Sequence, residues 1–379
     1  MEDLARTEIL EAMHARLEAA GVADSTGKKL TLRHRVAPVV IGRVGDDEPL
    51  FCTELTLAQT MPDKIFDGLG AIALLVQAQK VILVLHREAP KILSYVTQAA
   101  QATKIEVIAI PSLYPMDPIS LICDLAQRPQ KPSASLNLDQ ALVFNAVTLC
   151  DAAQALAGHY PLRRTLTVAG HVRKPGVMQA AIGTPIMEIV QTCGGSPDPD
   201  WIPFHNGVLG GSQVEQRTPV GADTRGIIIL SHDHPLITRA LTPLSALLRR
   251  AASACINCCL CTHRCPVHLS GGRLQPHLIM QNIATGWLGS EFLGHGSVLG
   301  ALECIHCAVC TLSCPALLEP AHIIKAVADQ LRLQGVTCAK EYALNPHPDR
   351  PGRRFSLQRV VERLGLSSYA KDPRLQQEA

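Results

Sequence analysis

Residues 255–266 read CINCCLCTHRCP, and residues 304–315 read CIHCAVCTLSCP. Both stretches follow the pattern Cys-x-x-Cys-x-x-Cys-x-x-x-Cys-Pro, so the second is an internal copy of the first. Three thiolates at a spacing of three can wrap one face of an iron–sulfur cube, whereas the fourth, beside a helix-breaking proline, points away. The two runs therefore predict a helical domain that binds two 4Fe-4S clusters.

The fourth cysteine of each run has its own expected role. In ferredoxins with two clusters, this cysteine binds the cube of the other run. The same logic predicts one cluster bound by Cys255, Cys258, Cys261 and Cys314, and a second bound by Cys304, Cys307, Cys310 and Cys265. The two cubes would then lie close enough for fast electron exchange, so the pattern predicts an electron-transfer protein.

Zinc is the alternative metal for such a segment. A zinc site takes four Cys or His ligands, usually as two separated pairs, and needs neither a third thiolate at this spacing nor a following proline. We therefore favour iron–sulfur clusters. Cys259 is a fifth thiol in the first run. Its neighbours Cys258 and Cys261 fit the register better, so we interpret it as a bystander, with a ligand as the alternative.

The other cysteines are scattered through apolar stretches, where a free thiol behaves as a small hydrophobic side chain. These predicted core residues are Cys52, Cys123, Cys150, Cys193 and Cys338. Three histidines flank the runs, namely His263, His268 and His306, and Arg264 precedes a predicted ligand. We expect the histidines to be solvated, with hydrogen bonds to cluster sulfur, which would tune the potential, as the alternative.

Composition and charge exclude several classes of function. With 379 residues, 47% of them hydrophobic, the chain is expected to form two or three folded domains. A formal net charge of +2 gives no global field to attract nucleic acid. The most apolar stretch, residues 71–85, is shorter than the roughly 20 residues that span a membrane. The acidic, amphipathic first helix does not resemble a secretion signal, so we expect a reducing cytoplasm, in which the thiols of the 14 cysteines stay free for metal binding or redox work rather than forming disulfides.

The apolar patterns predict a multidomain α/β fold. Within residues 1–130, predicted strands and helices alternate in a βαβ order, which is typical of a Rossmann-like, mostly parallel sheet. The strands are expected at 39–41, 81–85 and 105–110, and the helices at 63–77 and 89–101. A Pro-, Gln- and Ser-rich stretch at 127–135 predicts a linker, and we assign residues 131–163 to this linker and a connecting segment.

The remaining residues predict three further segments. Short strands and tight turns in residues 164–235 predict a small α+β domain, with strands at 165–168 and 226–230 and a helix at 185–192. Residues 243–335 form the predicted cluster domain, with helices at 243–251, 276–287 and 321–333. Residues 336–379 form a tail in which Leu357, Val360, Val361 and Leu364 lie on one face of a helix.

In this order of segments the chain resembles the RnfC/PduS family, and within it the PduS-like cobalamin reductases of bacterial microcompartments. TLTVAGHVRKPGVMQAAIGTPIMEIVQTCGG at 165–195 looks like the family's SLBB β-grasp module, and GVLGG at 207–211 stands where the family has a glycine-rich turn. SACINCCLCTHRCPVHLSGGRLQPHLIM at 253–280 and GRRFSLQRVVERLGLSSY at 352–369 are similar to PduS-like sequences. The resemblance covers nearly the whole chain.

The resemblance implies a nucleotide-binding-like first domain with FMN and NADH, but the loop that would bind them is altered. The family carries a glycine-rich GxGGAGFPT loop after the first helix, where residues 23–30 here read ADSTGKKL. Without those glycines, backbone N–H groups cannot approach a phosphate in the same conformation. Binding of FMN or NADH is therefore left open.

Two neighbouring segments carry alternative interpretations. The family's downstream Asn-x-x-Glu-Cys-Glu-Pro stretch is reduced to DDEP at 46–49, which we interpret as a surface turn, with a cleft shaped by Gly45 and Glu48 as the alternative. The basic residues Lys28, Lys29, Arg33, His34 and Arg35 are interpreted as a solvated strand edge, with a replacement phosphate site as the alternative.

Three functions follow. The favoured one is an electron relay from a flavin, NADH or ferredoxin-type donor through two 4Fe-4S clusters to an acceptor such as a cobalamin system. The second is an FMN-containing, NADH-dependent cobalamin reductase. The third is a structural paralogue associated with a microcompartment. The implied partners are redox proteins, cobalamin-processing proteins or microcompartment proteins, and the expected location is the cytoplasm or a microcompartment. No catalytic residue is assigned.

Overall fold

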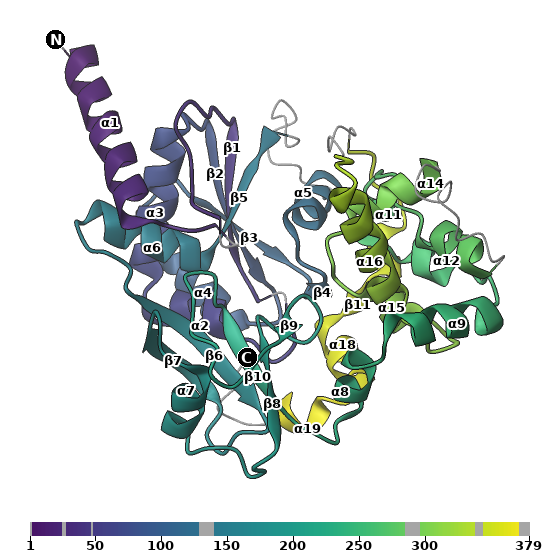
Figure 1. The fold of residues 1–379 in the computed structure, drawn as a ribbon. Coiled ribbons are helices and arrows are strands. Elements are labelled where there is room, and N and C mark those ends of the chain that lie inside the picture. The colour runs from purple at the N-terminus through teal and green to yellow at the C-terminus, as the bar shows by residue number, and fades with distance from the viewer. Residues whose placement is uncertain are drawn as a thin grey trace. The chain divides into compact units, whose positions relative to one another are not determined.

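The computed structural model describes residues 2–24, 28–46, 48–128, 140–284, 296–337 and 344–370, with the side chains of 2–6, 284, 296 and 297 left out (Figure 1). The chain forms two compact units. The first comprises residues 1–112, 132–232 and 365–379, and the second comprises 113–131 and 233–364. These units do not follow the predicted segments, because residues 113–131 belong with the cysteine runs rather than with the N-terminal sheet.

The first unit contains a four-stranded parallel sheet in the order β3-β2-β1-β5. Its strands are β1 (Val39–Val44), β2 (Lys80–His86), β3 (Glu106–Ile110) and β5 (Leu142–Asn145). The helices of this part are α1 (Glu2–Ala20), α2 (Thr53–Thr60), α3 (Pro62–Leu75), α4 (Pro90–Ala100) and α6 (Ala146–Leu156). The predicted βαβ order is therefore confirmed, and with it the α/β class.

The connecting segment differs from its prediction. Within the predicted connection 131–163, β5 pairs in parallel with β1, and α6 follows it directly. Asn145 ends the strand and caps the helix, because its Oδ1 accepts a hydrogen bond from Thr148 N at 2.9 Å. Three apolar residues followed by an asparagine, without alternation, give no periodic signal, so the pattern did not indicate this strand.

Both faces of the parallel sheet are buried along β1, and one large core cluster lies on one of these faces. Val40 and Val44 of β1 share it with Leu83 and Leu85 of β2, because alternate residues of a strand point to the same side. Buried side chains from α1, α2, α3, α4 and α6 complete the cluster. The helices α3 and α6 meet closely at Gly68, where an added Cβ would lie 2.0 Å from the carbonyl oxygen of Leu149.

Gly68→Ala should therefore destabilise the first unit. The new methyl group meets backbone rather than a flexible side chain, and overpacking of this kind costs about 1–3 kcal/mol. Gly70→Ala, on the same helix with no atom within 4 Å of the new Cβ, is the matched control. It should be neutral or stabilising by up to ~1 kcal/mol. Urea unfolding followed by circular dichroism compares the two variants, and equal midpoints would show that the helices do not approach this closely.

The first unit also contains a mixed five-stranded sheet in the order β7-β6-β10-β8-β9. Its elements are β6 (Arg163–Gly170), β7 (Gly176–Ala181), α7 (Ile186–Thr192), β8 (Trp201–His205), β9 (Ser212–Gln213) and β10 (Gly226–Ser231). β6 and β10 are parallel, and the other pairs are antiparallel. Apolar residues of β6, β10 and α7 form its core. The short α19 (Ser367–Ala370) also belongs to this unit.

The second unit is mainly helical. Its helices are α5 (Pro118–Ala126), α8 (Pro235–Ala240), α9 (Leu244–Ala254), α10 (Leu260–His263), α11 (Pro266–Leu269), α12 (Pro276–Ala284), α14 (Gly296–Leu299), the 3₁₀ helix η2 (Gly300–Glu303), α15 (Val309–Ser313), α16 (Pro320–Leu333), α17 (Arg350–Arg353) and α18 (Leu357–Arg363). The predicted helix at 276–287 is confirmed as far as Ala284, and its last residues lie outside the described ranges. The helix expected in the tail is α18.

Residues 344–364 pack within the second unit. β11 (Phe355–Ser356) pairs with β4 (Leu113–Tyr114). Arg350 and Arg354 both form ion pairs with Asp124, the latter at 2.6 Å, and both arginine side chains are almost fully buried. The described part of the tail is therefore held to α5 by buried charges as well as by the β4–β11 ribbon.

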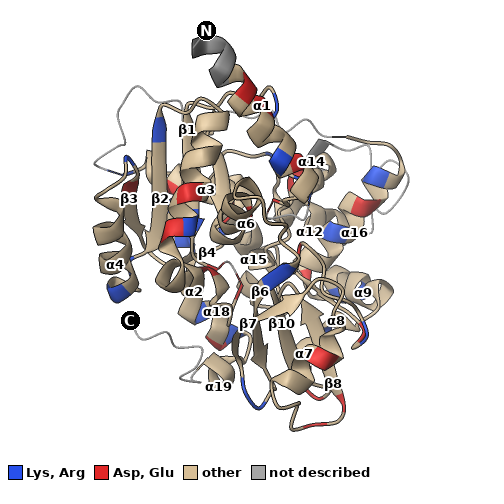
Figure 2. Ribbon diagram, turned by 90° about the vertical axis from the view of Figure 1, so that its left-hand side faces the viewer, with Lys and Arg blue, Asp and Glu red and all other residues tan. Residues whose placement is uncertain are grey.

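Positively and negatively charged residues are interspersed along the ribbon, as Figure 2 shows for Lys and Arg and for Asp and Glu. This agrees with the formal net charge of +2. Among the described residues, no helix combines the length and the apolar character needed to cross a bilayer.

Candidate metal centre

The two cysteine runs fold into the same loop. Asn257 and Cys259 have φ angles of 50° and 59°, and the equivalent residues His306 and Ala308 have 57° and 54°. Left-handed backbone is uncommon outside glycine, so its recurrence at the same two positions marks a repeated structural unit. Each loop then enters a short helix, α10 or α15. The internal copy in the sequence is thus also a copy in conformation.

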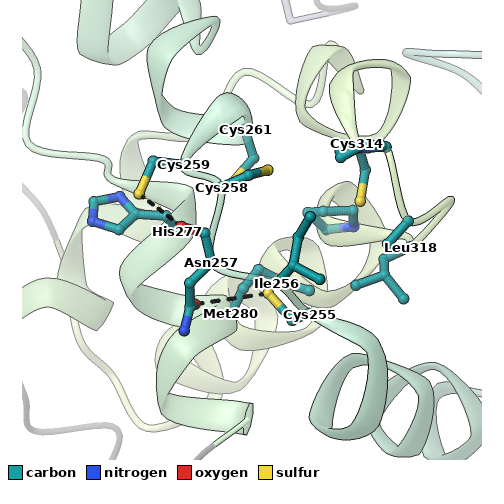
Figure 3. A pocket seen from close by; sticks show the side chains of 13 residues that line it. Cys255, Ile256, Asn257, Cys258, Cys259, Cys261, His277, Met280, Cys314 and Leu318 are labelled. Atoms are coloured by element: carbon teal, nitrogen blue, oxygen red, sulfur yellow. Dashed lines mark hydrogen bonds between the residues drawn. The ribbon is translucent and has the colours of Figure 1, made fainter.

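The repeat bears on the fifth thiol of the first run. Cys259 occupies the position of Ala308, which has no metal-binding side chain. Its Sγ lies 3.4 Å from the backbone oxygen of Asn257, and Figure 3 shows the thiol directed to that carbonyl. Both observations favour the interpretation of Cys259 as a bystander.

A cavity lies where the first loop meets the end of the second run (Figure 3). Its cysteines are Cys255, Cys258, Cys259 and Cys261 from the first run and Cys314 from the second. The other lining residues are Ile256, Asn257, His277, Met280, Pro315, Ala316, Leu318 and Pro320. The four cysteines predicted as ligands of the first cluster therefore share one mainly apolar cavity, and that cavity includes the cysteine contributed by the other run.

The remaining four predicted ligands are neighbours deeper in the unit. Burial is the main cause that raises the pKa of Cys307 and Cys310 well above the usual range, and the nearby Cys265 and Cys304 raise both further. Burial also raises the pKa of Cys265 to about 12, with Cys304 as a further cause. Four mutually close, desolvated thiols would remain protonated on their own, because ionised thiolates would be both buried and mutually repelling.

Backbone N–H groups act in the opposite direction. His306 N donates a hydrogen bond to Cys304 Sγ at 3.4 Å. The N–H groups of Val267 and His268 lower the pKa of Cys265, and that of Val309 lowers the pKa of Cys307. Such donors stabilise negative charge on sulfur.

The donor set fits iron–sulfur clusters. Soft thiolates, apolar walls and N–H donors to sulfur are the environment that such clusters require. Among the described residues, no three His, Cys, Asp or Glu side chains converge tightly enough to hold a single metal ion.

The residues that flank the runs have differing surroundings. His263 is exposed, as expected, whereas His268 and His306 are half-buried. Burial, and then neighbouring histidines, lower the pKa of His268. Arg264 stacks on Phe355, with its guanidinium carbon 4.6 Å from the ring centre, and donates a hydrogen bond to the Arg353 carbonyl at 3.0 Å.

Two side chains near the predicted ligands gave no signal in the sequence. Tyr114 donates its hydroxyl hydrogen bond to the Cys307 carbonyl at 2.8 Å. His277 lines the first cavity and shares a hydrogen bond of 2.8 Å with Thr262 Oγ1, next to Cys261. Tyr114 is 193 residues from Cys307, so no local pattern could connect them.

The altered loop after α1 closes on itself. Asp24 N donates to the Lys28 carbonyl at 2.8 Å, and Lys28 N donates to Asp24 Oδ1 at 3.1 Å. Ala23 and Lys29 form an isolated bridge, while residues 25–27 lie outside the described ranges. In the described part of this hairpin, the backbone N–H groups of Asp24 and Lys28 thus bond within the loop. They do not form the open row that a phosphate requires.

The basic segment is not a strand edge, which corrects the prediction. Arg33 and His34 form a turn, and His34 has a φ of 62°. Arg33 pairs with Glu11 and Glu18 of α1, so its charge anchors that helix. His34 and Arg35 are exposed, as are Lys28 and Lys29. With Arg33 engaged by α1, the five residues do not form a phosphate site around a common centre.

The interpretation of residues 46–49 as a surface turn is wrong. Asp46 is buried and Glu48 is only 2% exposed, whereas Asp47 lies outside the described residues. Glu48 accepts hydrogen bonds from the backbone N–H groups of Leu209, at 3.3 Å, and Gly210. Asp46 accepts one from Glu54 N at 3.0 Å. These donors compensate the burial of the carboxylates, which is why the acidic stretch is not at the surface.

The glycine-rich turn at 207–211 is therefore built around an internal carboxylate. An added Cβ at Gly207, whose φ is +105°, would lie 2.2 Å from Glu48 Cδ. Only a residue without a side chain fits there. In this structure, the backbone N–H groups of Leu209 and Gly210 in this turn donate hydrogen bonds to the carboxylate of Glu48.

The scattered cysteines follow their prediction where they are described. Cys52, Cys123, Cys150 and Cys193 are buried, whereas Cys338 lies outside the described residues. Burial raises the pKa of Cys52 and of Cys150 to about 12.

Three family models match successive parts of the chain. Residues 15–154 match the Nuo51 FMN-binding domain, residues 165–213 the SLBB domain, and residues 254–319 the 4Fe-4S dicluster domain. The second match confirms the predicted β-grasp module, and the third confirms the predicted two-cluster domain.

Curated relatives extend over most of the chain. Cobalamin reductase PduS of Citrobacter freundii is 28% identical over 373 residues, which cover 96% of this chain and 80% of that protein. PduS of Salmonella typhimurium is 27% identical, with 97% and 82% covered. One protein of the ion-translocating oxidoreductase complex of Rhodobacter capsulatus is 26% identical over 69% of this chain and 50% of its own length.

A solved structure is similar in fold. A chain of the NAD⁺-reducing [NiFe]-hydrogenase in the H₂-reduced state superposes with a TM-score of 0.52 at 15% identity, covering 89% of this chain and 69% of that one. In the order of the three matched domains, and in its near full-length similarity to PduS, this chain is similar to the RnfC/PduS family.

Proposed function

We propose that this protein relays electrons through two 4Fe-4S clusters with crossed ligands. One cluster is bound by Cys255, Cys258, Cys261 and Cys314, and the other by Cys304, Cys307, Cys310 and Cys265. The observation that carries the proposal is the position of Cys314, which lines the cavity of the first run although it belongs to the second. The 4Fe-4S dicluster match over residues 254–319 supports it.

The clusters supply one-electron chemistry, and the protein sets their environment. The buried thiols Cys265 and Cys310 would give the second cluster a low-dielectric site, and backbone N–H groups would stabilise charge on sulfur. Tyr114 fixes the loop through the Cys307 carbonyl.

The partners follow from the relatives. We infer a flavin-, NADH- or ferredoxin-linked donor and a redox partner as the acceptor, such as a cobalamin system, because the relatives are a cobalamin reductase and members of oxidoreductase complexes. We place this work in the cytoplasm or inside a bacterial microcompartment.

Anaerobic purification followed by metal analysis tests the relay. We expect about eight iron and about eight sulfide per chain, four of each for every cluster, with visible absorption that dithionite bleaches. Stoichiometric flavin should be absent. Zinc in place of iron would overturn the proposal, and clusters that dithionite cannot reduce would favour a structural role instead.

A second candidate is an FMN-containing, NADH-dependent cobalamin reductase. The match of residues 15–154 to the Nuo51 FMN-binding domain favours it. The hydrogen bonds between Asp24 and Lys28, in the place of the family's glycine-rich loop, do not fit the family's way of binding a phosphate. Stoichiometric FMN, released on denaturation and detected by fluorescence, would establish this candidate over the relay.

Cys259→Ala should leave the iron content unchanged. The equivalent residue of the other loop is Ala308, so an alanine is already compatible with a loop of this conformation. Iron and sulfide should stay at about eight per chain, because none of the eight proposed ligands is lost. Cys258→Ala, which changes the adjacent thiol, is the control and should lose about half of the iron. Equal losses in both variants would identify Cys259 as a ligand.

A further inference from the structure

We propose that the rim of the first cavity is the docking surface for a small acidic redox protein, which exchanges electrons with the cluster of Cys255, Cys258, Cys261 and Cys314. This rests on the proposed function and adds the site and chemical character of the partner. The surface, here called the cluster rim, consists of Arg249, Arg250, Ile256, Leu260 and Leu317 around the exposed Cys258.

The two predicted clusters differ in their access to solvent. Cys258 of the first set is exposed and the other three thiols of that set are half-buried. In the second set, Cys304 and Cys307 are half-buried, and Cys265 and Cys310 are only 5% and 8% exposed. Electron tunnelling falls steeply with distance, so a protein partner exchanges electrons most readily where a cluster approaches the surface. The first cluster is therefore the one that a partner can reach directly.

Apolar side chains gather at this point without being covered within the described residues. Ile256 is 70% exposed and Leu317 is 77% exposed. Ile256 lines the cavity together with Leu318, the residue next to Leu317 (Figure 3). Contiguous apolar side chains exposed to water are typical of interaction sites.

Arg250 borders this apolar centre, and Arg249 precedes it on the same helix. Arg249 and Arg250 are exposed on the last turns of α9, which leads directly into Cys255. The guanidinium of Arg250 lies 3.5 Å from the Leu317 carbonyl, so its charge is beside the exposed leucine. In the described part of the chain, neither arginine forms an ion pair.

The sequence around the cavity offers these arginines almost no acidic partner. From Leu241 to Pro320 the acidic residues are Glu291, Glu303 and Glu319, and Glu319 is paired with Arg239 at 2.6 Å. Glu303 is buried and pairs with Arg273 at 2.8 Å, and Glu291 lies outside the described residues. The positive charge of the rim is therefore available to an external anion.

An apolar centre with a basic border fits a protein that presents acidic residues around its own cofactor. Complementary charge accelerates encounter and orients the partners, and the apolar contact excludes water between them. A 4Fe-4S cube with four thiolates is itself negatively charged, so an acidic partner needs nearby cations to approach it. Arg249 and Arg250 meet that need.

A second group of arginines is the rival surface. Arg264, Arg359 and Arg363 all lie over the ring of Phe355, at 4.6, 5.8 and 5.2 Å. Two of them also donate hydrogen bonds to backbone carbonyls, Arg264 to Arg353 and Arg363 to Leu312. Stacking on Phe355 holds these charges within the unit, whereas among the described residues neither Arg249 nor Arg250 stacks on an aromatic ring, which favours the cluster rim.

The test uses the full chain with its clusters and an acidic plant-type [2Fe–2S] ferredoxin as the probe. Stopped-flow bleaching measures the rate constant for cluster reduction by reduced ferredoxin, with reduced methyl viologen as a small reductant. Calorimetry measures binding of oxidised ferredoxin. Arg249→Glu/Arg250→Glu should lower the ferredoxin rate constant and the affinity by about tenfold or more at low salt. The viologen rate should stay within about twofold, since no cluster ligand has changed.

Two further variants make the test specific. Leu317→Ser should slow ferredoxin about threefold without changing the response to salt, because it removes apolar contact but no charge. Arg359→Glu reverses one exposed charge of the rival surface and should have no effect. If Arg359→Glu slows ferredoxin as much as Arg250→Glu does, or if the rim variants leave its rate unchanged, the cluster rim is not the docking surface.

The outcomes separate this inference from the proposed function. Clusters that viologen cannot reduce would contradict the relay itself. Clusters that viologen reduces but ferredoxin does not would leave the relay standing and overturn the acidic partner. Binding to anionic phosphatidylserine vesicles that is lost in Arg249→Glu/Arg250→Glu, with no effect on ferredoxin, would assign the rim to a membrane surface and also overturn the proposal.

Discussion

The double variant Cys255→Ala/Cys314→Ala should retain one intact 4Fe-4S cluster, with about four iron and four sulfide per chain. With crossed ligands, both substitutions remove thiolates from the same cluster, the one whose cysteines line the first cavity. The other four thiols, Cys265, Cys304, Cys307 and Cys310, remain complete. A single reducible species should therefore persist in the electron paramagnetic resonance spectrum.

The double variant Cys304→Ala/Cys314→Ala carries the same number of substitutions and is the matched control. Both of its changes fall in the second run, but with crossed ligands they remove one thiolate from each cluster. It should therefore lose most of its iron and both signals. If each cluster were bound by its own run, the results would be exchanged: the first variant would lose both clusters and the second would keep one.

Single variants provide a second check of the ligand assignment. Cys255→Ala and Cys314→Ala should leave the same residual spectrum, and Cys265→Ala and Cys304→Ala should leave the other. Far-ultraviolet circular dichroism checks that each variant retains its helices. A variant that unfolds would lose both signals irrespective of which cluster its cysteine binds, so only folded variants decide the ligand assignment.

Periodic segments were the most predictable part of the fold. β1, β2 and β3 and the helices α3, α4, α16 and α18 lie at or within about three residues of their expected positions, a typical error at element boundaries. They carry long apolar runs or a helical stripe of the kind that α18 shows at Val360 and Val361. These patterns predict the observed elements because tertiary packing buries the same apolar faces that give the pattern.

Short and non-local elements escaped sequence reasoning. The ribbon between β4 and β11 has two residues in each strand, and its strands are more than 240 residues apart. No window of sequence contains that pairing. For the same reason the inclusion of residues 113–131 in the second unit was not anticipated.

The candidate centre also has features that the sequence could predict and features that it could not. The spacing of the cysteines could be predicted to matter, because the thiolates of one run are neighbours in the chain. The burial of Glu48 could not, because its hydrogen-bond donors, Leu209 and Gly210, are about 160 residues away. An acidic turn is read as exposed unless its distant donors are known.

Asp124→Ala should destabilise the second unit by about 3–5 kcal/mol, the cost of removing one partner from a buried ion pair. Asp124 pairs with both Arg350 and Arg354, whose side chains are 0% and 2% exposed. Arg350 also donates to the Ser120 carbonyl at 2.9 Å, and Arg354 to the Leu113 carbonyl at 2.7 Å. Neutral acceptors remain in the variant, but the counter-charge of two buried guanidinium groups is lost.

Asp329→Ala is the matched control, because Asp329 also pairs with two cations, Lys325 and Arg332, at 2.9 Å each. These side chains are 46–60% exposed, so water replaces the lost carboxylate and the cost should stay below about 1 kcal/mol. Hydrogen exchange of peptides from α5 and α18 measures the difference locally. In Asp124→Ala it should accelerate by roughly 100-fold or more, since every 1.4 kcal/mol gives about a factor of ten. Similar exchange in both variants would mean that the buried charges are not what fastens residues 344–364 to α5.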